Sequence, residues 1–316
     1  MSMEELISKH LATWTGAQST KAAGGRGRGR KRSGAQGHYG IKKLRELILE
    51  LAVRGKLVPQ DPADEPASVL LERIAAEKAS LIKAGKIKKQ KALPPIAAEE
   101  KPFELPAGWQ FARFGKATFN RDFERIPLSV AERKERGGTY DYYGASGIID
   151  SIDDYIFDKS LLLIGEDGAN LINRSTPIAF MAHGKYWVNN HAHVLDGLTE
   201  DLLLYICLHI NAISLEAYVT GTAQPKMNQA KMNSIVLALP PLAEQHRIVA
   251  KVDELMALCD RLEKHQTDSI ATHQTLLTTL LDALTASADH AEFTATWQRI
   301  SEHFDILFTT EQSIDQ

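Results

Sequence analysis

Residues 221–262 read GTAQPKMNQAKMNSIVLALPPLAEQHRIVAKVDELMALCDRL, and two kinds of sequence meet in this stretch. The first part, up to Asn233, carries amides and lysines but no acid. A short apolar run and the prolines at 240–241 follow, and from Leu242 onward apolar residues recur at helical spacing. The stretch therefore predicts a polar loop at the root of a long helix.

The helical pattern continues well beyond this stretch. Eleven positions from Val249 to Leu284 alternate in steps of three and four, and eight of them are apolar; the exceptions are Glu263, Gln266 and His273. We expect one helix over 243–286 that packs on another long helix, because a small domain cannot cover such a length. The polar middle then sets the register or weakens the pairing. A break near Ser269 is the alternative, and a further amphipathic helix is expected over 290–308.

The N-terminal part predicts helices separated by turns. Apolar residues lie on one face of 41–53, and Gly55 is the expected stop. A second helix is predicted over 66–84, with Pro66 in its first turn and Gly85 at its end.

The first 40 residues have a different composition. Residues 1–15 predict a short amphipathic helix. Between Lys21 and Lys43 there are eight Lys or Arg and no acid, in a Gly-rich context. This composition is typical of a flexible extension, either a solvated tether or an arm that binds phosphates.

The middle of the chain changes character again. Short apolar runs alternate with Gly, Asn and Asp turns, which is typical of short strands, and one helical stretch begins after Thr199, a plausible N-cap. We therefore predict an α+β fold: one mixed α/β domain with long α-helical spacer or coiled-coil regions. The expected segments are a basic extension (1–40), a helical region and linker (41–100), the mixed domain (101–241), the spacer helix (242–286) and a C-terminal helical segment (287–316).

Composition excludes several classes of protein. The net charge is −3, so the total charge does not indicate a polyanion partner. Two distant cysteines make no disulfide framework and fit a reducing compartment. We find no secretory signal and no apolar run of about 18 residues, so we expect a cytoplasmic protein without a membrane span.

Motifs for catalysis are sparse. The sequence lacks a phosphate-binding G-x-x-x-x-G-K-[ST] loop and a G-x-S-x-G elbow. The best metal candidate is His191 and His193, and the residues that could join them are His183, Cys207 and His209. Adjacent Glu166 and Asp167 predict either a solvated hairpin or part of a nuclease metal site. We expect no catalytic residues and no cofactor.

Polar loops of the mixed domain are the more informative feature. Asn and Gln can pair with adenine, Arg and Lys with guanine, and all of them with phosphates. Several such loops in one small domain favour nucleic-acid binding. The candidate DNA-binding residues are Tyr143, Ser146, Asn170, Arg174, Lys185, Tyr186, Asn189, Gln224, Lys226, Asn228 and Lys231.

Four stretches carry a resemblance to a known family. They are LRELILELAVRGKLVPQDPADEPASVLLERIAAEK (44–78), FELPAGWQFARFG (103–115), YYGASGIID with LLIGEDGANL, and the opening stretch up to VDEL. Together they resemble the specificity (S) subunit, HsdS, of type I restriction-modification systems. The likeness runs from about residue 41 to the C-terminus; the 1–40 extension lies outside it.

The resemblance implies a function without catalysis in this chain. Family members read part of a bipartite site in double-stranded DNA with a target recognition domain. Their helical regions dock methyltransferase (M) subunits, which bind S-adenosylmethionine and methylate adenine, and a restriction (R) subunit cleaves elsewhere. The chain shows one such domain, so the resemblance predicts a half-length form. Two copies would then form a dimer through the long helix, whose length would set the half-site spacing.

Two other functions stay open from the sequence. One is a metal-dependent nuclease that uses Glu166, Asp167 and the His191/His193 pair. The other is an assembly scaffold that binds M subunits without reading DNA.

Overall fold

The computed structural model describes residue 9 and residues 39–221, 224–287 and 290–302. Its contacts divide the chain into two compact units: residues 46–255 form one, and residues 1–45 together with 256–316 form the other. The predicted helix over 1–15, apart from Lys9, and the basic tract up to residue 38 lie outside the described residues.

The predicted helices in the first part are confirmed. Helix α3(Tyr39–Val53) contributes residues to both units, and α4(Ala67–Lys83) lies in the 46–255 unit. Pro66 is the N-cap of α4, one position before the predicted first turn. Gly55 and Gly85 follow the two helices with φ of +67° and +69°, the left-handed conformation that glycine adopts readily at helix ends.

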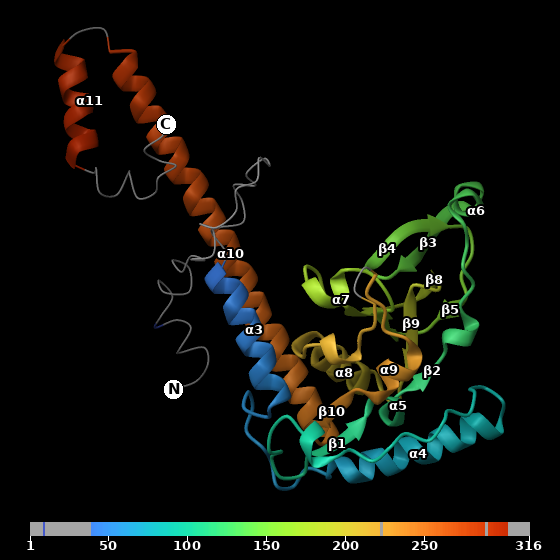
Figure 1. The fold of residues 1–316 in the computed structure, drawn as a ribbon. Helices are drawn as coiled ribbons and strands as arrows, with labels where there is room; N and C mark the ends of the chain where they lie inside the picture. Colours follow the sequence, from blue (N-terminus) through green and yellow to red (C-terminus); the bar gives the residue numbers. More distant parts are fainter. Residues whose placement is uncertain (1–8, 10–38, 222–223, 288–289, 303–316) are drawn as a thin grey trace. The chain divides into compact units, whose positions relative to one another are not determined.

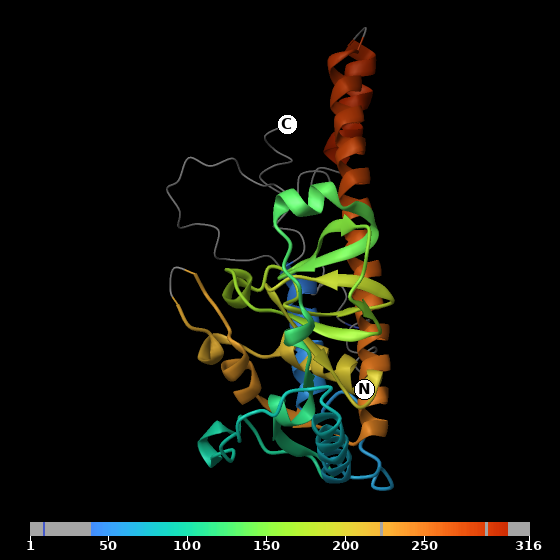
Figure 2. The same cartoon turned by 90° about the vertical axis from the view of Figure 1, so that its right-hand side faces the viewer.

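Three sheets build the 46–255 unit (Figures 1 and 2). The first has the order β2-β9-β6-β7 and is antiparallel; its strands are β2(Phe119–Asn120), β9(Ala192–Asp196), β6(Leu161–Gly165) and β7(Ala179–Ala182). The second has the order β4-β3-β8-β5, with β3 and β8 parallel; its strands are β4(Gly147–Ile152), β3(Gly137–Gly144), β8(Lys185–Val188) and β5(Phe157–Asp158). The third pairs β1(Gln110–Arg113) with β10(Val236–Leu239).

One apolar core lies where side chains of the first two sheets meet. Residues of β3, β5 and β8 pack with residues of β6, β7 and β9 in one apolar cluster: Tyr143, Phe157, Leu161, Leu163, Ala182, Tyr186, Val188, Ala192 and Val194. All five residues of β6 are buried, which is expected for a central strand covered on both faces.

Helix α8(Glu200–Ala212) attaches to the first sheet. Its N-cap, Thr199, accepts a hydrogen bond from the amide of Leu202 at 3.2 Å, as the sequence predicted. Near its C-terminus, the Asn211 side chain bonds the backbone of Ile178, just before β7, and of Ala179, the first residue of β7. The shorter helices are η2(Ala98–Glu100), α5(Phe114–Ala117), η3(Asp122–Glu124), α6(Val130–Glu135), α7(Asn170–Asn173), η4(Glu216–Tyr218) and α9(Gln229–Ser234).

The long helix begins where β10 ends. Helix α10(Leu242–Thr285) starts directly after Pro241 and runs without interruption through residue 269, so the alternative of a break near Ser269 is wrong. In the 46–255 unit, Ile248, Val252 and Leu255 are buried on its apolar stripe. The root of α10 therefore belongs to the same packed unit as the sheets.

The other unit explains one polar exception in the stripe. Arg45 of α3 donates to Asp260 at 2.7 Å and to Glu263 at 2.9 Å, so Glu263 faces a charged partner on another helix. Helix α11(His290–Glu302) packs Ile300 against Leu280, Leu281 and Leu284 of α10. The predicted helix over 290–308 is thus present up to residue 302, the last residue described.

Candidate nucleic-acid interface

Four turns and loops come together in the 46–255 unit, and we call them the loop cluster: residues 144–147, 166–168, 189–191 and the described part of 220–228, which is 220–221 and 224–228. Backbone hydrogen bonds connect them. Asn189 N bonds Tyr143 O at 3.1 Å, Glu166 N bonds His191 O at 2.8 Å, and Met227 N bonds Glu166 O at 2.8 Å. The cluster is therefore fixed to the ends of β3, β6, β8 and β9, a rigid base for polar side chains.

The 220–228 loop is the acid-free loop of the opening sequence. Its two ends meet in a backbone pair, with Thr220 N to Lys226 O at 2.9 Å and Lys226 N to Thr220 O at 2.8 Å. Asn228 is the N-cap of α9 and accepts from Lys231 N at 3.0 Å. The loop thus returns on itself and leads directly into a capped helix.

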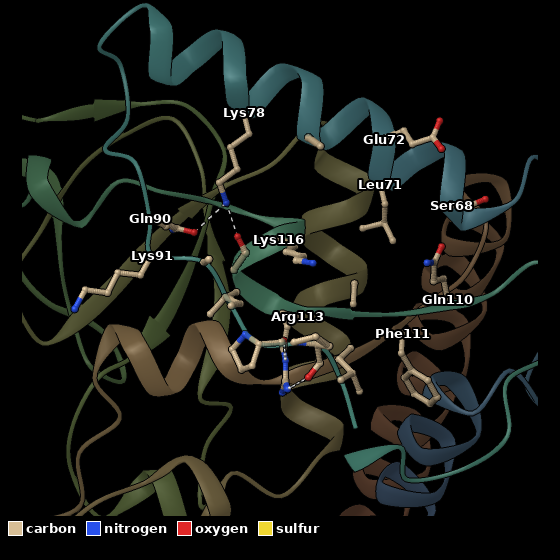
Figure 3. Close-up of a pocket in the computed structure, with 18 of the residues that line it drawn as sticks. Ser68, Leu71, Glu72, Lys78, Gln90, Lys91, Gln110, Phe111, Arg113 and Lys116 are labelled. Carbon is tan, nitrogen blue, oxygen red and sulfur yellow. Dashed lines mark hydrogen bonds between the residues drawn. The ribbon is translucent and has the colours of Figure 1, made fainter. Parts of the chain in front are cut away.

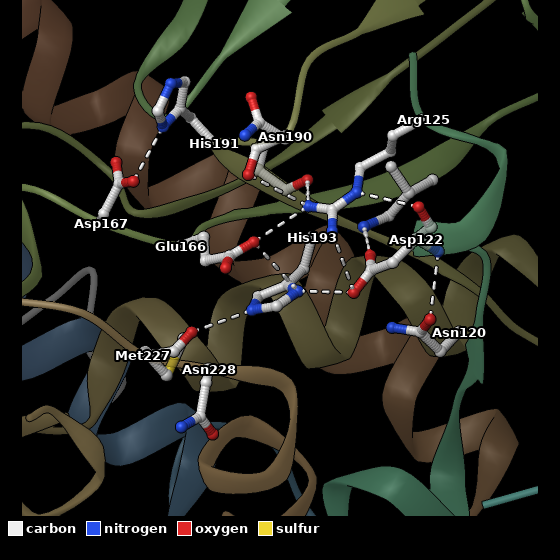
Figure 4. Close-up of polar contacts among 12 residues, drawn as sticks. Asn120, Asp122, Arg125, Glu166, Asp167, Asn190, His191, His193, Met227 and Asn228 are labelled. Carbon is white, nitrogen blue, oxygen red and sulfur yellow. Dashed lines mark hydrogen bonds and ion pairs between the residues drawn. The ribbon is translucent and has the colours of Figure 1, made fainter. Parts of the chain in front are cut away.

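A buried histidine lies beneath this loop (Figure 4). His193 is 1% exposed, and its Nδ1 lies 2.7 Å from Asp122 Oδ2 while its Nε2 lies 2.9 Å from the carbonyl oxygen of Met227. Burial alone would lower the pKa of His193, but the hydrogen bond and charge of Asp122 outweigh it and raise the pKa above its ordinary value. The imidazole connects β9 to the loop.

Glu166 takes part in the same charge network. Arg125 donates to its carboxylate at 3.0 Å, and Lys226 of the loop pairs with it at 3.2 Å. Burial would raise the pKa of Glu166, but the charge of His193 and the bonds from Arg125 and Lys226 hold it below its ordinary value. The predicted solvated hairpin is therefore wrong for Glu166, whose side chain is only 12% exposed.

The predicted metal ligands do not converge. His191 precedes β9 and its exposed ring bonds Asp167 at 2.8 Å, while His193 points into the interior. His209 is buried, accepts from the amide of Ala238, and burial lowers its pKa to about 4. Within the part of the chain that the structure describes, no group of three or more His, Cys, Asp or Glu is arranged to hold a metal ion.

Three candidate contact residues lie in the interior, contrary to the prediction from the sequence. Tyr143 and Tyr186 belong to the apolar core between the two sheets, and their rings pack edge-on at 5.4 Å. Asn189 is 5% exposed, and its side-chain oxygen accepts from His191 N at 2.7 Å. Core packing and turn formation occupy these side chains, so they do not belong to the contact surface.

Three more candidates lie away from the exposed loops or have structural partners. Lys185 starts β8, at the end of that strand opposite the loop cluster, and lies over the Tyr155 ring at 4.6 Å. Arg174 donates to the carbonyls of Ile210 and Ile213 at the end of α8. Asn170 bonds Ser175 and Thr176 within its own turn. These contacts stabilise the domain.

The remaining candidates stay exposed on the loop cluster or the helix that follows it: Ser146, Gln224, Lys226, Asn228 and Lys231. Asn190 and His191 join them on the exposed surface, although the sequence analysis did not select them as contacts. Asp122 and Arg125 were missed altogether. The charged run RDFER at 121–125 was the available signal, but its partners are 40 to 70 residues away in sequence.

A groove in the same unit lies elsewhere (Figure 3). It has a volume of about 1000 Å³ and is lined by α4 and residues 89–116, including Leu71, Phe111 and the aliphatic part of Lys78. The Lys78 amine donates to Gln90, Gly115 O and Thr118 O, and burial lowers its pKa to about 8. This amine is satisfied by the chain itself and stabilises the junction of α4 with α5.

Comparison with known proteins agrees with this geometry. Residues 122–272 match the family model described as the type I restriction modification DNA specificity domain. These residues include the whole loop cluster. The chain belongs to the family of type I restriction-modification specificity subunits.

Two curated relatives from Escherichia coli align with all of the chain. The EcoAI specificity subunit is 41% identical over 339 aligned residues and the EcoEI specificity subunit 40% over 331; the alignments cover 56% and 55% of those proteins. The chain thus spans about half the length of these relatives. A solved S subunit from M. genitalium has a TM-score of 0.39 and 11% identity, covering 75% of this chain and 54% of that one.

Membrane-spanning segments are not found among the described residues. None of the helices there combines the length and the hydropathy that crossing a membrane requires.

Proposed function

We propose that this chain is a DNA-reading subunit of a type I restriction-modification assembly, and that the loop cluster reads base edges. The observation that carries the proposal is the exposed set of amides, lysines and a hydroxyl on the loop cluster and the helix that follows it: Ser146, Asn190, Gln224, Lys226, Asn228 and Lys231. Side-chain amides can bond adenine at two atoms, and lysine donates to guanine or to phosphate.

The charges of the cluster suit a polyanion. The acids that lie there are engaged: Glu166 by Arg125 and Lys226, and Asp167 by His191. The carboxylates therefore present little free negative charge to an approaching phosphate backbone. The same engagement disfavours the nuclease alternative, because the Glu166 carboxylate already pairs with the cationic side chains of Arg125 and Lys226.

We further propose that the chemistry lies on other subunits. In this proposal the chain catalyses nothing and binds double-stranded DNA, methyltransferase subunits and, through the complex, restriction subunits. A second copy of the chain would pair through α10. The domain limits proposed from the sequence, 101–241 for the reading domain and 242–286 for the spacer, are kept as part of this proposal.

A binding selection tests the reading role. The chain with its methyltransferase partner is incubated with a random-sequence duplex pool, and the enriched sequences are compared between wild type, the double variant Gln224→Ala/Lys231→Gln and the control Lys185→Gln. Lys185 lies at the other end of β8, so the control should keep the wild-type motif. We expect the double variant to relax or change a few adjacent positions of the motif. An unchanged motif in the double variant contradicts the assignment of the loop cluster.

The two alternatives give other outcomes. In the same selection, a scaffold without readout would bind the methyltransferase but enrich no sequence. A nuclease would cut plasmid with Mg²⁺ or Zn²⁺ as the purified chain alone, and Glu166→Gln would abolish the cutting.

A further inference from the structure

We propose that His193 is the positioning residue that holds residues 224–228 of this loop in the pose that contacts DNA, an inference that rests on the proposed function. The His193 side chain is buried, so it does not contact DNA itself. It acts through the loop, because its Nε2 bonds the carbonyl oxygen of Met227, one residue before Asn228 and three after Gln224.

The geometry defines the charge of the ring. Asp122 Oδ2 and Met227 O, the two atoms opposite the ring nitrogens, are both acceptors: a carboxylate oxygen and a backbone carbonyl. A backbone carbonyl has no hydrogen to give, and Asp122 has a pKa held below its ordinary value despite burial. Acceptors opposite both ring nitrogens favour the imidazolium, the form in which both nitrogens donate.

Charged groups surround this imidazolium from several elements (Figure 4). Asp122 of η3 lies at 2.7 Å and Glu166, after β6, at 3.9 Å. Arg125 lies between these two carboxylates, 3.7 Å from Asp122 and 3.0 Å from Glu166. Lys226 of the loop pairs with the other oxygen of Glu166, Oε1, at 3.2 Å. On its own strand segment, His191 pairs with Asp167 and points to solvent.

The attachment of the loop depends on a few bonds, and the network supplies one of them. Residues 225–227 bond the chain through Pro225 O to Gly168 N at 3.0 Å, Met227 N to Glu166 O, and Met227 O to His193. The Met227 side chain is fully buried, so its burial also holds this part of the loop in place. Loss of the His193 bond would leave the Met227 carbonyl without the donor that the ring supplies.

The position of the Met227 carbonyl affects base reading, because it fixes the residues on either side of it. Hydrogen bonds to base edges require donor–acceptor distances of roughly 2.7–3.2 Å. A shift of the Met227 carbonyl moves the flanking Gln224 and Asn228 together. Contacts with phosphates tolerate such shifts better, because they depend mainly on charge. A loosened loop should therefore lose sequence discrimination more than general affinity.

Two matched substitutions separate the bond to the loop from the rest of the residue. The amide nitrogen of Gln occupies the place of the histidine Nε2, whereas that of Asn occupies the place of Nδ1. His193→Gln therefore keeps a donor for Met227 O, and His193→Asn keeps only a donor for Asp122. Both variants remove the charge, so their difference isolates the bond to the loop.

The experiment uses the full chain with its methyltransferase partner. Hydrogen exchange of residues 225–228 reports loop docking, and affinities for the enriched duplex and for a duplex without the motif report discrimination. We expect faster exchange and a roughly tenfold lower discrimination ratio for His193→Asn, with His193→Gln near wild type. The affinity for the duplex without the motif should change little in both variants. Equal behaviour of the Asn and Gln variants, with exchange as in wild type, overturns the inference.

The same data distinguish failure of the inference from failure of the proposed function. Faster exchange at 225–228 in His193→Asn with an unchanged discrimination ratio means that the loop is positioned by His193 but does not read DNA. If either variant fails to fold, the wild-type protein gives a second measurement through its pH profile.

The pH profile follows from the direction of the shifts. The raised pKa of His193 means that its contribution is complete below the ordinary histidine pKa and is lost as pH rises through the folded-state pKa. Asp122 and Glu166, with lowered pKa values, lose theirs as pH falls. We expect wild-type discrimination to fall at alkaline pH while His193→Gln shows no such fall. A flat wild-type profile above the ordinary histidine pKa of about 6.5 contradicts the inference.

Discussion

Glu244 shows at the scale of one residue how the long helix is attached to its unit. Its side chain is 1% exposed and accepts hydrogen bonds from Trp109 Nε1 at 2.9 Å and Gln60 Nε2 at 3.2 Å. Three stretches distant in sequence thus meet at one carboxyl group. Burial raises the pKa of Glu244 despite these bonds.

Glu244→Ala should therefore destabilise the protein. Removing the acceptor leaves the Trp109 indole N–H without this partner at a buried position, and Gln60 keeps only its bond to the Gly55 carbonyl; we expect a loss of about 2–4 kcal/mol in the free energy of unfolding. Urea unfolding followed by tryptophan fluorescence measures it. The exposed Glu72 is the control, and Glu72→Ala should change stability by less than about 0.5 kcal/mol. Equal effects of the two substitutions contradict the role assigned to Glu244.

Single residues also mark where the sequence was misleading. Tyr142 and Tyr143 both resemble surface residues beside the glycines of GASG, yet both are buried because the second sheet is covered on both faces. Neither periodicity nor composition reveals such a cover. By contrast, the exposure of Gln224, Lys226, Asn228 and Lys231 could be expected. Buried amides and lysines need hydrogen-bond or charge partners, and an acid-free run supplies few of them.

At the scale of elements, the helix ends offer a matched comparison. Gly55 and Gly85 share a positive φ, but a Cβ on Gly55 would lie 2.5 Å from Pro106 Cγ, whereas nothing lies within 4 Å of a Cβ on Gly85. Gly85→Ala should lose about 1–2 kcal/mol from backbone strain alone. Gly55→Ala should lose a further amount of about 1–3 kcal/mol from the clash. Thermal and urea unfolding of the two variants measure the difference.

A result in which both glycine variants are equally stable would show that Pro106 moves aside freely. The packing between the end of α3 and the 106–109 turn would then contribute nothing to fixing the helix.

Elements also separate what the sequence could show from what it could not. The helices were predictable because their apolar periodicity is local: α3, α4 and α10 lie within a few residues of the expected limits, and α8 begins directly after Thr199 as expected. Strand pairing was not predictable, because it joins residues that are distant in sequence. Strand β1 pairs with β10, more than 120 residues later, and β3 pairs in parallel with β8. The loop cluster exists only through those pairings.

At the scale of the whole molecule, a second basic segment lies next to Phe123, which follows Asp122 of the charge network. Residues 83–91 carry five exposed lysines and no acid: Lys83, Lys86, Lys88, Lys89 and Lys91. The Lys88 amine lies 5.7 Å from the centre of the Phe123 ring, and Phe123 follows Asp122, the partner of His193. We expect these exposed lysines to contact phosphates when the loop cluster binds DNA.

Replacing Lys86, Lys88 and Lys89 by Gln should weaken binding to all duplexes similarly. The slope of log K against log salt should become shallower by about 0.9 for each phosphate that the variant no longer neutralises, with the enriched motif unchanged. Titrations at several salt concentrations measure the slope, with Lys185→Gln as the control. A changed motif would assign these lysines to base reading, and an unchanged slope would leave them as solvated charges.

The central claim is that the loop cluster determines which DNA sequence is recognised. The most direct measurement is the genomic methylation motif in cells that express this chain with its methyltransferase partner, compared with the Gln224→Ala/Lys231→Gln variant. We predict a bipartite motif in the wild type and a change in the variant that is confined to the bases read by this domain. The same motif at the same strength in both would contradict the account.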